Sequence, residues 1–267
     1  MTIDWSTVRY VAFDMDGTIY LGDKLFAETP PCLAKLAQLG IGYTFITNNC
    51  SKSRAEYRAH LQKMGLDVAT DSVTTSAQAT TSLLRARCPG KTKLFVLGAP
   101  GLVDDLQSEG FVIDENDPEV VVVGFDLRLN YERLCQTAYL ISQGLPYLAT
   151  HPDRVCPTNL PTILPDCGAV CALLESATGR NPDAIAGKPN PSMLGFTIEK
   201  HGLKPHEIVV IGDRPHTDIA LAKAAGARSV LTLTGEATRE SLLDIPAAAY
   251  PDAIINNLSE LPPLLRP

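Results

Sequence analysis

The sequence predicts an α/β protein in which a doubly wound parallel sheet carries an inserted second α/β domain. Apolar, β-branched runs alternate with amphipathic helical segments near both ends of the chain, which is the pattern of strands and crossover helices in parallel sheets. The segment between these two parts spans roughly a hundred residues, which is too long for one connection between neighbouring strands. We therefore expect one sheet built from both ends of the chain, with a separate domain inserted between them.

The first part of the chain begins the sheet. We expect a buried strand from Val8 to Asp14, a helix from Pro31 to Leu39, and a second strand from Tyr43 to Thr47. Ser53 and Glu56 have the spacing of a capping box, which predicts that another helix begins there. Strand, helix, strand, helix is the order of a parallel sheet with helices on both faces.

The last part of the chain repeats this order and is expected to extend the same sheet. Its expected elements are a helix from Pro191 to Gly202, a strand from Ile208 to Ile211, a helix from Ile219 to Ala225 and a strand from Ser229 to Leu233. The middle has elements of its own, with strands at Leu94–Leu97, Val120–Val123 and Tyr147–Ala149 and helices near Tyr131–Ser142 and Gly168–Ala177. We expect residues 1–76 and 186–267 to form the core and residues 77–185 to form the inserted domain.

Composition limits the classes of partner. The formal net charge is -7 over 267 residues, and an acidic surface disfavours binding to nucleic acid or to anionic membranes. The 7 cysteines include no C-x-x-C pair, which predicts neither a disulfide framework nor a zinc site. The segment from Met1 to Arg9 lacks the basic and apolar regions of a signal peptide, and no apolar run is long enough to span a bilayer. These features favour a cytoplasmic protein.

Polar residues gather where three of the expected strands end. They are Asp14, Asp16 and Thr18 after the first strand, Thr47, Asn48 and Asn49 after the second, and Asp213 with Asp218 after the strand at Ile208–Ile211. Ligands of open parallel sheets bind at the carboxyl ends of the strands, so we expect these clusters to meet. Four carboxylates at one edge require a compensating positive charge, which Mg²⁺ and Lys188 can supply.

Attack on phosphorus is the chemistry that suits these groups. Asp14 is the expected nucleophile, because a carboxylate can attack phosphorus when a metal neutralises charge on both partners. Asp16, which is followed by a turn at Gly17, can protonate the leaving oxygen and later activate water. Each motif by itself is an ordinary turn or loop, and their joint occurrence at strand ends is what indicates a site. The residues expected to hold the substrate are Thr47, Asn48, Asn49 and Lys188.

These motifs resemble those of the haloacid dehalogenase superfamily, and the resemblance covers nearly the whole chain. The segment from Asp14 to Thr18 resembles the first motif, Thr47 the second, Lys188 the third, and Gly212-Asp213 with Asp218 the fourth. Thr-Asn-Asn, Gly-Lys-Pro, Gly-Asp-Arg-x-x-Thr-Asp-Ile and the triplet Leu233–Gly235 are similar to the NagD-like, nitrophenylphosphatase-like branch. The resemblance implies a Rossmann-like core, a type-two α/β cap, and a Mg²⁺-dependent phosphatase.

The resemblance also implies a role for each acidic residue. Asp14 forms the aspartyl-phosphate and binds the metal, and Asp16 is the general acid and base and binds the metal through its carbonyl oxygen. Asp213 completes the protein's share of the metal ligands. Asp218 orients water molecules on the metal without binding it directly.

The chain departs from the pattern of this branch in the fourth motif and in the cap. His216 stands where the branch commonly has an Asp, at a position that is not expected to bind metal. The cap has Thr-His-Pro-Asp and Pro-Asp-Cys-Gly in place of the more common Thr-Asn-x-Asp and Pro-Gly-x-Gly. Because the cap closes over the substrate in this superfamily, four residues in and next to these stretches are candidates for substrate contact. They are His151, Asp153, Arg154 and Asp166, and the alternative is that they stabilise loops through capping hydrogen bonds.

The expected substrates are small organic phosphates: sugar phosphates, nucleoside monophosphates, phosphoglycolate, nitrophenyl phosphate or a phosphorylated cofactor. A phosphomutase of the same superfamily and a phosphoacceptor or binding protein without turnover are the alternatives. A receiver domain has no need of a general acid at Asp16, and the inserted domain also argues against that class. Cap-mediated dimers occur among similar proteins, so a homodimer is the expected assembly.

Overall fold

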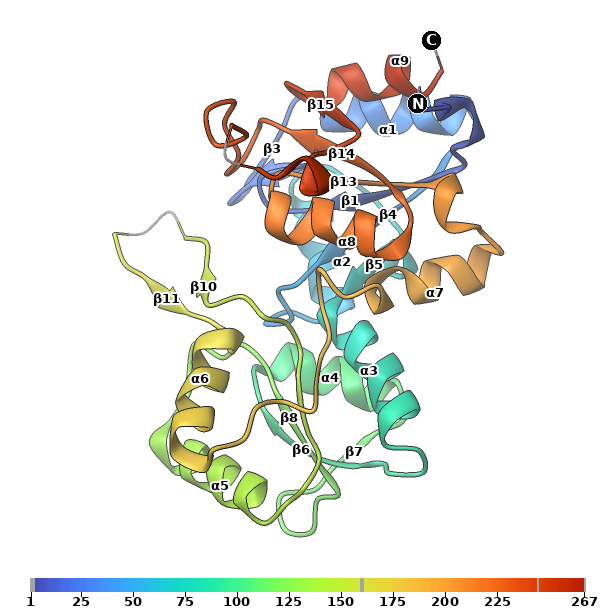
Figure 1. Ribbon diagram of the computed structural model, residues 1–267. Helices are drawn as coiled ribbons and strands as arrows, with labels where there is room; N and C mark the ends of the chain where they lie inside the picture. The colour runs from blue at the N-terminus through green and yellow to red at the C-terminus, as the bar shows by residue number, and fades with distance from the viewer. Residues whose placement is uncertain (1–2, 159–160, 244, 267) are drawn as a thin grey trace. The chain divides into compact units, whose positions relative to one another are not determined.

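The computed structural model describes residues 3–158, 161–243 and 245–266. The chain divides into two compact units (Figure 1). The first unit comprises Met1–Thr47, Arg58–Val73 and Lys188–Pro267, and the second comprises Asn48–Tyr57 and Thr74–Gly187. The sequence-based division placed residues 48–57 with the core, whereas in the structure this segment packs with the second unit.

The first unit is built on a six-stranded sheet with the order β15-β14-β13-β1-β4-β5. These strands are β1 (Tyr10–Asp14), β4 (Gly42–Thr47), β5 (Val73–Thr75), β13 (Ile208–Gly212), β14 (Arg228–Thr232) and β15 (Ala253–Ile255). The pairs from β15 to β4 are parallel, and every residue of β1 and β13 is buried, as expected for central strands covered on both faces. The expected α/β class is confirmed. The strand order reverses between β1 and β13, where open α/β sheets bind their ligands.

Helices and turns complete the first unit. Its helices are α1 (Thr29–Gln38), α7 (Ser192–His201), α8 (Ala220–Ala225) and α9 (Leu261–Leu265), and α2 (Arg54–Lys63) begins in the second unit and continues into the first. A short antiparallel hairpin, β2 (Tyr20–Leu21) with β3 (Lys24–Leu25), follows β1. Single 3-10 turns lie at Trp5–Thr7, Thr70–Ser72, Pro205–Glu207, Ala247–Ala249 and Leu258–Glu260.

The helix expected from Ile219 to Ala225 begins differently in the structure. Pro215–Ile219 form a π-helical turn, and only Ala220–Ala225 continue as a regular α-helix. Such turns occur frequently at functional sites, where they redirect a side chain. The turn carries Asp218, whose buried side chain packs directly against Gly212 at the end of β13. The segment is too short for the spacing of its apolar residues to reveal one widened turn.

The second unit has a five-stranded parallel sheet with the order β12-β9-β8-β6-β7. Its strands are β6 (Lys93–Leu97), β7 (Val112–Ile113), β8 (Val120–Val123), β9 (Tyr147–Ala149) and β12 (Ala184–Ile185). Its helices are α3 (Ser76–Arg87), α4 (Pro100–Ser108), α5 (Tyr131–Ser142) and α6 (Cys167–Thr178). A hairpin of β10 (Val155–Cys156) and β11 (Leu164–Pro165) leads into α6 (Figure 1).

Alternating side chains of β6 and β8 supply two separate cores in this unit. Leu94 and Val120 belong to the cluster that includes residues of α3 and α4, whereas Phe95 and Val121 belong to the cluster with α5 and α6. Each face of the sheet is therefore covered by one pair of helices, as the continuous apolar run in β8 requires. Within the described residues, no helix has the length and hydropathy needed to cross a membrane.

Candidate active site

Parallel pairing in the first unit brings three strand ends to one edge of the sheet. Asp14, the last residue of β1, pairs with Ile46, so Thr47 lies one residue further along β4. On the other side, Phe13 pairs with Ile211, so Asp14 lies level with the end of β13 and with Asp213 just beyond it. The register therefore places the expected nucleophile beside two of the other polar clusters.

A buried ion-pair network lies at this edge. The ammonium group of Lys188, which is 3% exposed, donates hydrogen bonds to Asp14 Oδ1 and to Asp218 Oδ1, the latter at 2.8 Å. Burial lowers the pKa of Lys188, but the charges of Asp14 and Asp218 outweigh it and raise the pKa above its ordinary value. Burial raises the pKa of Asp14, and the nearby ammonium of Lys188 opposes this shift. Lys188 is therefore charged and compensates only part of the local negative charge.

Asp213 supplies the third buried carboxylate. Its Oδ2 accepts a hydrogen bond of 2.7 Å from the Glu236 N–H, while its Oδ1 has no hydrogen-bond partner in the part of the chain that the structure describes. Ligand oxygens of Asp14, Asp213 and Asp218 all lie within 4.8 Å of one another. Burial, followed by the charges of Asp14 and Asp218, raises the pKa of Asp213 to about 7. A buried carboxylate oxygen without a donor, beside two other carboxylates, is the arrangement that a hard divalent cation satisfies.

Asp16 differs from the other acidic residues because its side chain is exposed. It lies in the turn after β1, where Gly17 has φ +85° and donates its N–H to the Tyr20 carbonyl at 2.7 Å. Partial burial and then the charge of Asp14 raise the pKa of Asp16. A raised pKa in an accessible carboxyl group is what a general acid needs near neutral pH.

Asn48 and Asn49 follow Thr47 along the chain but belong to the second unit. The side-chain amide of Asn48 donates a hydrogen bond of 3.1 Å to Asp153 Oδ2, and the backbone carbonyl of Asn48 accepts one of 2.6 Å from the Ser76 hydroxyl. Asn49 Oδ1 accepts a bond of 2.9 Å from the Ser51 N–H. These contacts fix the segment after Thr47 against the second unit, which the sequence pattern did not predict.

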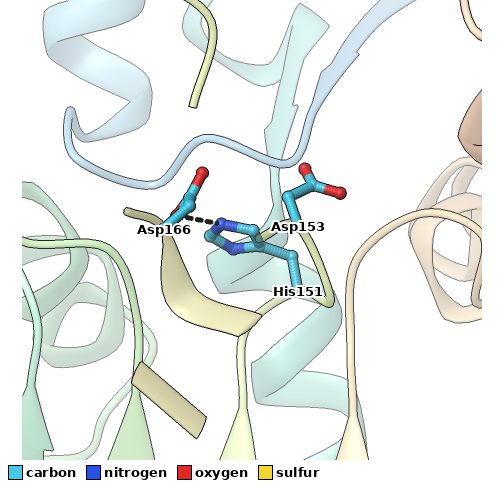
Figure 2. A group of neighbouring side chains, drawn as sticks. All are labelled: His151, Asp153 and Asp166. Carbon is cyan, nitrogen blue, oxygen red and sulfur yellow. Dashed lines mark hydrogen bonds and ion pairs between the residues drawn. The ribbon is translucent and has the colours of Figure 1, made fainter. Parts of the chain in front are cut away.

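The four candidates for substrate contact in the inserted domain differ in accessibility. Figure 2 shows three of them, His151, Asp153 and Asp166. His151 is fully buried, with Nε2 2.8 Å from Asp166 Oδ1 and Nδ1 2.8 Å from the Thr150 hydroxyl, so both ring nitrogens have partners. Asp166 also accepts a hydrogen bond from the Cys167 N–H and caps the start of α6. Asp153 is half-buried and Arg154 is exposed. Among the four, Asp153 and Arg154 are the accessible ones.

Several residues near the carboxylates were not assigned a role from the sequence. Arg214 lies next to Asp213, forms an ion pair of 3.0 Å with Glu236, and is close enough to lower the pKa values of Asp14, Asp16 and Asp213. The position of Arg214 directly after Asp213, in the Gly-Asp-Arg motif, is the sequence feature that could have placed it at the site. The loop after β14, which includes the Leu233–Gly235 triplet, also contacts the site. His216 is exposed, unlike the buried Asp218 two residues later.

The fold and this site are those of a haloacid dehalogenase-like hydrolase, and the chain belongs to that family. Residues 11–112 match the family described as haloacid dehalogenase-like hydrolase, and residues 185–261 match the one described as HAD-hydrolase-like. Ribonucleotide monophosphatase NagD of Escherichia coli K12 is 30% identical over 240 residues, which cover 90% of this chain and 93% of NagD.

Two solved structures extend the likeness over the whole chain. The 4-nitrophenylphosphatase of Thermotoga maritima has 40% sequence identity and a TM-score of 0.93, and the match covers 98% of this chain and 99% of that one. The glycerol phosphate phosphatase of Mycobacterium tuberculosis, solved in complex with magnesium, has 28% identity and a TM-score of 0.88, covering 98% of this chain and 79% of that chain. The expected place in the NagD-like, nitrophenylphosphatase-like branch is confirmed.

Proposed function

We propose that the chain is a Mg²⁺-dependent phosphatase that hydrolyses phosphate monoesters of small organic molecules through an aspartyl-phosphate on Asp14. The observation that carries the proposal is the convergence of Asp14, Asp213 and Asp218 with Lys188 at the carboxyl edge of the first unit's sheet. The reaction class is further supported by family membership, because the relatives named above are phosphatases.

Asp14 and Asp16 divide the chemistry between them. An oxygen of Asp14 forms a bond to phosphorus while the bond from phosphorus to the ester oxygen breaks. Asp16 gives its proton to that ester oxygen, so the alcohol leaves neutral and Asp16 becomes a carboxylate. Asp16 then takes a proton from a water molecule whose oxygen bonds to phosphorus while the bond from phosphorus to the Asp14 oxygen breaks. Phosphate departs, and both aspartates return to their starting states.

The buried carboxylates fit a magnesium site. Asp14 and Asp213 would hold the ion with the backbone carbonyl of Asp16. The atom that supports this assignment is Asp213 Oδ1, which has no hydrogen-bond partner among the described residues. Asp218 would support the site without binding the ion directly, because its two oxygens already accept hydrogen bonds from Lys188 and, at 3.1 Å, from the Arg214 N–H. When bound, Mg²⁺ neutralises charge on the phosphoryl oxygens and on the attacking carboxylate.

The remaining residues would bind the substrate. Lys188 and Thr47 lie beside Asp14 and are assigned to the transferring phosphoryl group, where fixed positive charge and donors are most effective. We assign selection of the rest of the substrate to the second unit, with Asn48, Asn49, Asp153 and Arg154 as contacts and His151 with Asp166 as support for their loop. The names of the relatives cover ribonucleotide, nitrophenyl and glycerol phosphates, which supports a small phosphate ester as substrate.

Assembly and location are also part of the proposal. An exposed stripe on α5, formed by Tyr131, Cys135 and Tyr139 at a spacing of one helical turn, supports a homodimer in which a second copy covers this face. Light scattering on the purified chain tests this, and a monomer at all concentrations would contradict it. All seven cysteines are free, which supports a reducing compartment such as the cytoplasm.

Phosphate release from p-nitrophenyl phosphate and a panel of small phosphate esters tests the proposed function. We expect activity with Mg²⁺, none in EDTA, and recovery when Mg²⁺ is restored. The variant Asp14→Asn should lose activity about a thousandfold or more while keeping its circular dichroism spectrum. The control is Asp71→Asn, which changes an exposed carboxylate that pairs with Lys200. Turnover that survives chelation, or a rate near wild type in Asp14→Asn, would contradict the proposal.

A further inference from the structure

The loop after β14 touches two of the acidic motifs at once. We define loop 234–237 as Thr234, Gly235, Glu236 and Ala237. It begins within the Leu-Thr-Gly triplet, to which the catalytic roles above assign nothing. Its contacts show what the triplet contributes to the site.

One part of loop 234–237 fixes Asp213. The Glu236 N–H donates to Asp213 Oδ2 at 2.7 Å, and the Ala237 N–H donates to the Asp213 backbone carbonyl at 3.1 Å. A Cβ on Gly235 would lie 2.0 Å from Asp213 Oδ2, so only glycine allows this approach. With Oδ2 held in this way, Oδ1 is the oxygen left for a cation.

The other part of the loop fixes the turn after Asp16. The Thr234 hydroxyl donates a hydrogen bond of 2.7 Å to the Gly17 carbonyl. Thr234 has a single hydroxyl proton, so the buried Thr232 hydroxyl, 3.0 Å away, donates to Thr234 and fixes its orientation. Gly17 is packed tightly, because a Cβ there would lie 2.5 Å from Asp213 Oδ2 and 3.2 Å from the Gly235 Cα. The Asp16–Gly17 turn, Asp213 and loop 234–237 therefore form one interlocked group.

We propose that Thr234 is a positioning residue for Asp16, which it acts on through the Gly17 carbonyl. The hydroxyl holds the Gly17–Thr18 peptide, so it fixes the turn that follows Asp16 and with it the place of the Asp16 carboxyl when that group transfers its proton to the leaving oxygen. This inference rests on the proposed function, which supplies the role of Asp16 as general acid. A small displacement of a proton donor lowers the rate of the step that needs it and leaves other steps less affected.

A comparison of two leaving groups tests this role. Phenyl phosphate and p-nitrophenyl phosphate have similar shapes, but phenolate is the poorer leaving group and depends more on protonation. For Thr234→Val we expect kcat/KM, which reports the steps up to release of the alcohol, to fall about tenfold with phenyl phosphate and less than about threefold with p-nitrophenyl phosphate. Thr234→Ser keeps the hydroxyl and should restore both rates. Thr238→Val is the matched control, because Thr238 is exposed in the same stretch and its hydrogen bonds, to Ser241 and Glu240, stay within its own turn.

The variant Asp16→Asn separates failure of this inference from failure of the proposed function. If Asp16→Asn lowers kcat/KM equally with both substrates, the role of Asp16 as general acid is wrong. If Asp16→Asn loses phenyl phosphate selectively while Thr234→Val affects both substrates equally or neither, the positioning role of Thr234 is overturned. Thr234→Ala is measured in parallel. If Thr234→Val does not fold, Thr234→Ala must show the same selective loss of activity with phenyl phosphate.

Discussion

Replacing Asp213 with Asn should stabilise the metal-free protein while removing its activity. Burial and the neighbouring carboxylates raise the pKa of Asp213 from 3.8 to about 7, so the folded state disfavours the ionised form. Each unit of such a difference corresponds to about 1.4 kcal/mol, which gives an upper limit of about 4 kcal/mol at a pH above both values. Asn has no charge to bury, and its side-chain oxygen can still accept the hydrogen bond that Asp213 accepts from Glu236.

The size of the stability difference between Asp213→Asn and the wild type depends on pH. Well below pH 3.8 the carboxyl is protonated in both the folded and the unfolded chain, so Asp213→Asn should not change the free energy of unfolding there through this group. As the pH rises toward 7, the unfolded chain ionises first, and the wild-type protein loses stability relative to the variant. At pH 8 in EDTA we expect the variant to be about 2–4 kcal/mol more stable.

Urea unfolding followed by circular dichroism, with EDTA and with Mg²⁺, measures this difference. Saturating Mg²⁺ should stabilise the wild type, by about 2.7 kcal/mol at a hundredfold excess over the dissociation constant, and should not stabilise Asp213→Asn. Asp71→Asn is the control of opposite sign, because the hydrogen bond from Lys200 lowers the pKa of Asp71 and its loss should not stabilise the fold. A variant at position 213 that is no more stable than wild type at pH 8 in EDTA would refute the reasoning.

Three further substitutions test individual contacts. Lys188→Met should lower the free energy of unfolding by about 3–5 kcal/mol in EDTA, because Asp14 and Asp218 lose their buried counter-charge; urea unfolding measures this, and an unchanged midpoint would count against the network. Gly235→Ala should lower Mg²⁺-dependent phosphate release more than tenfold, since its Cβ would displace Asp213; a rate equal to wild type would show that the loop adjusts. His151→Ala should cost about 2–4 kcal/mol of stability by leaving Asp166 and Thr150 without their buried partner; a thermal shift near zero would argue that the network contributes little.

The sequence was sufficient to predict β1, β4, β13 and β14 of the first unit's sheet and the outline of its site, whereas the short strands β5 and β15 were not predicted. Continuous apolar runs identified β1 and β13, and polar residues at their ends identified the edge where Asp14 and Asp213 meet. This worked because pairing between parallel strands aligns their carboxyl ends whatever their distance in the sequence. The π-helical turn at Pro215–Ile219 escaped prediction, because one additional residue in a turn leaves no periodic trace in so short a segment.

Interactions between distant segments could not be predicted from one sequence. The bond from Asn48 to Asp153 joins residues 105 positions apart, and that from Thr234 to Gly17 joins residues 217 apart. Neither contact has a local pattern, since a lone hydroxyl or amide is compatible with many environments. The burial of His151 was equally hidden, because a histidine in a loop is as compatible with substrate contact as with a structural hydrogen bond. Local rules therefore identify the chemical groups, and the fold decides which of them are accessible.

The charge balance of the site links its stability to its activity. Asp14, Asp213 and Asp218 are buried near the ammonium of Lys188. When all three are ionised, their charge exceeds that of the ammonium by two, and the nearby Arg214 guanidinium offsets part of the difference. Burial, followed by the charges of Asp14 and Asp218, raises the pKa of Asp213 to about 7. Protonation relieves part of the negative charge, whereas a divalent cation would relieve all of it. Protons and Mg²⁺ therefore compete for the same carboxylates, and binding of the cation should weaken as the pH falls below 7. The clustering of carboxylates that destabilises the metal-free fold is therefore the same feature that favours binding of a divalent cation.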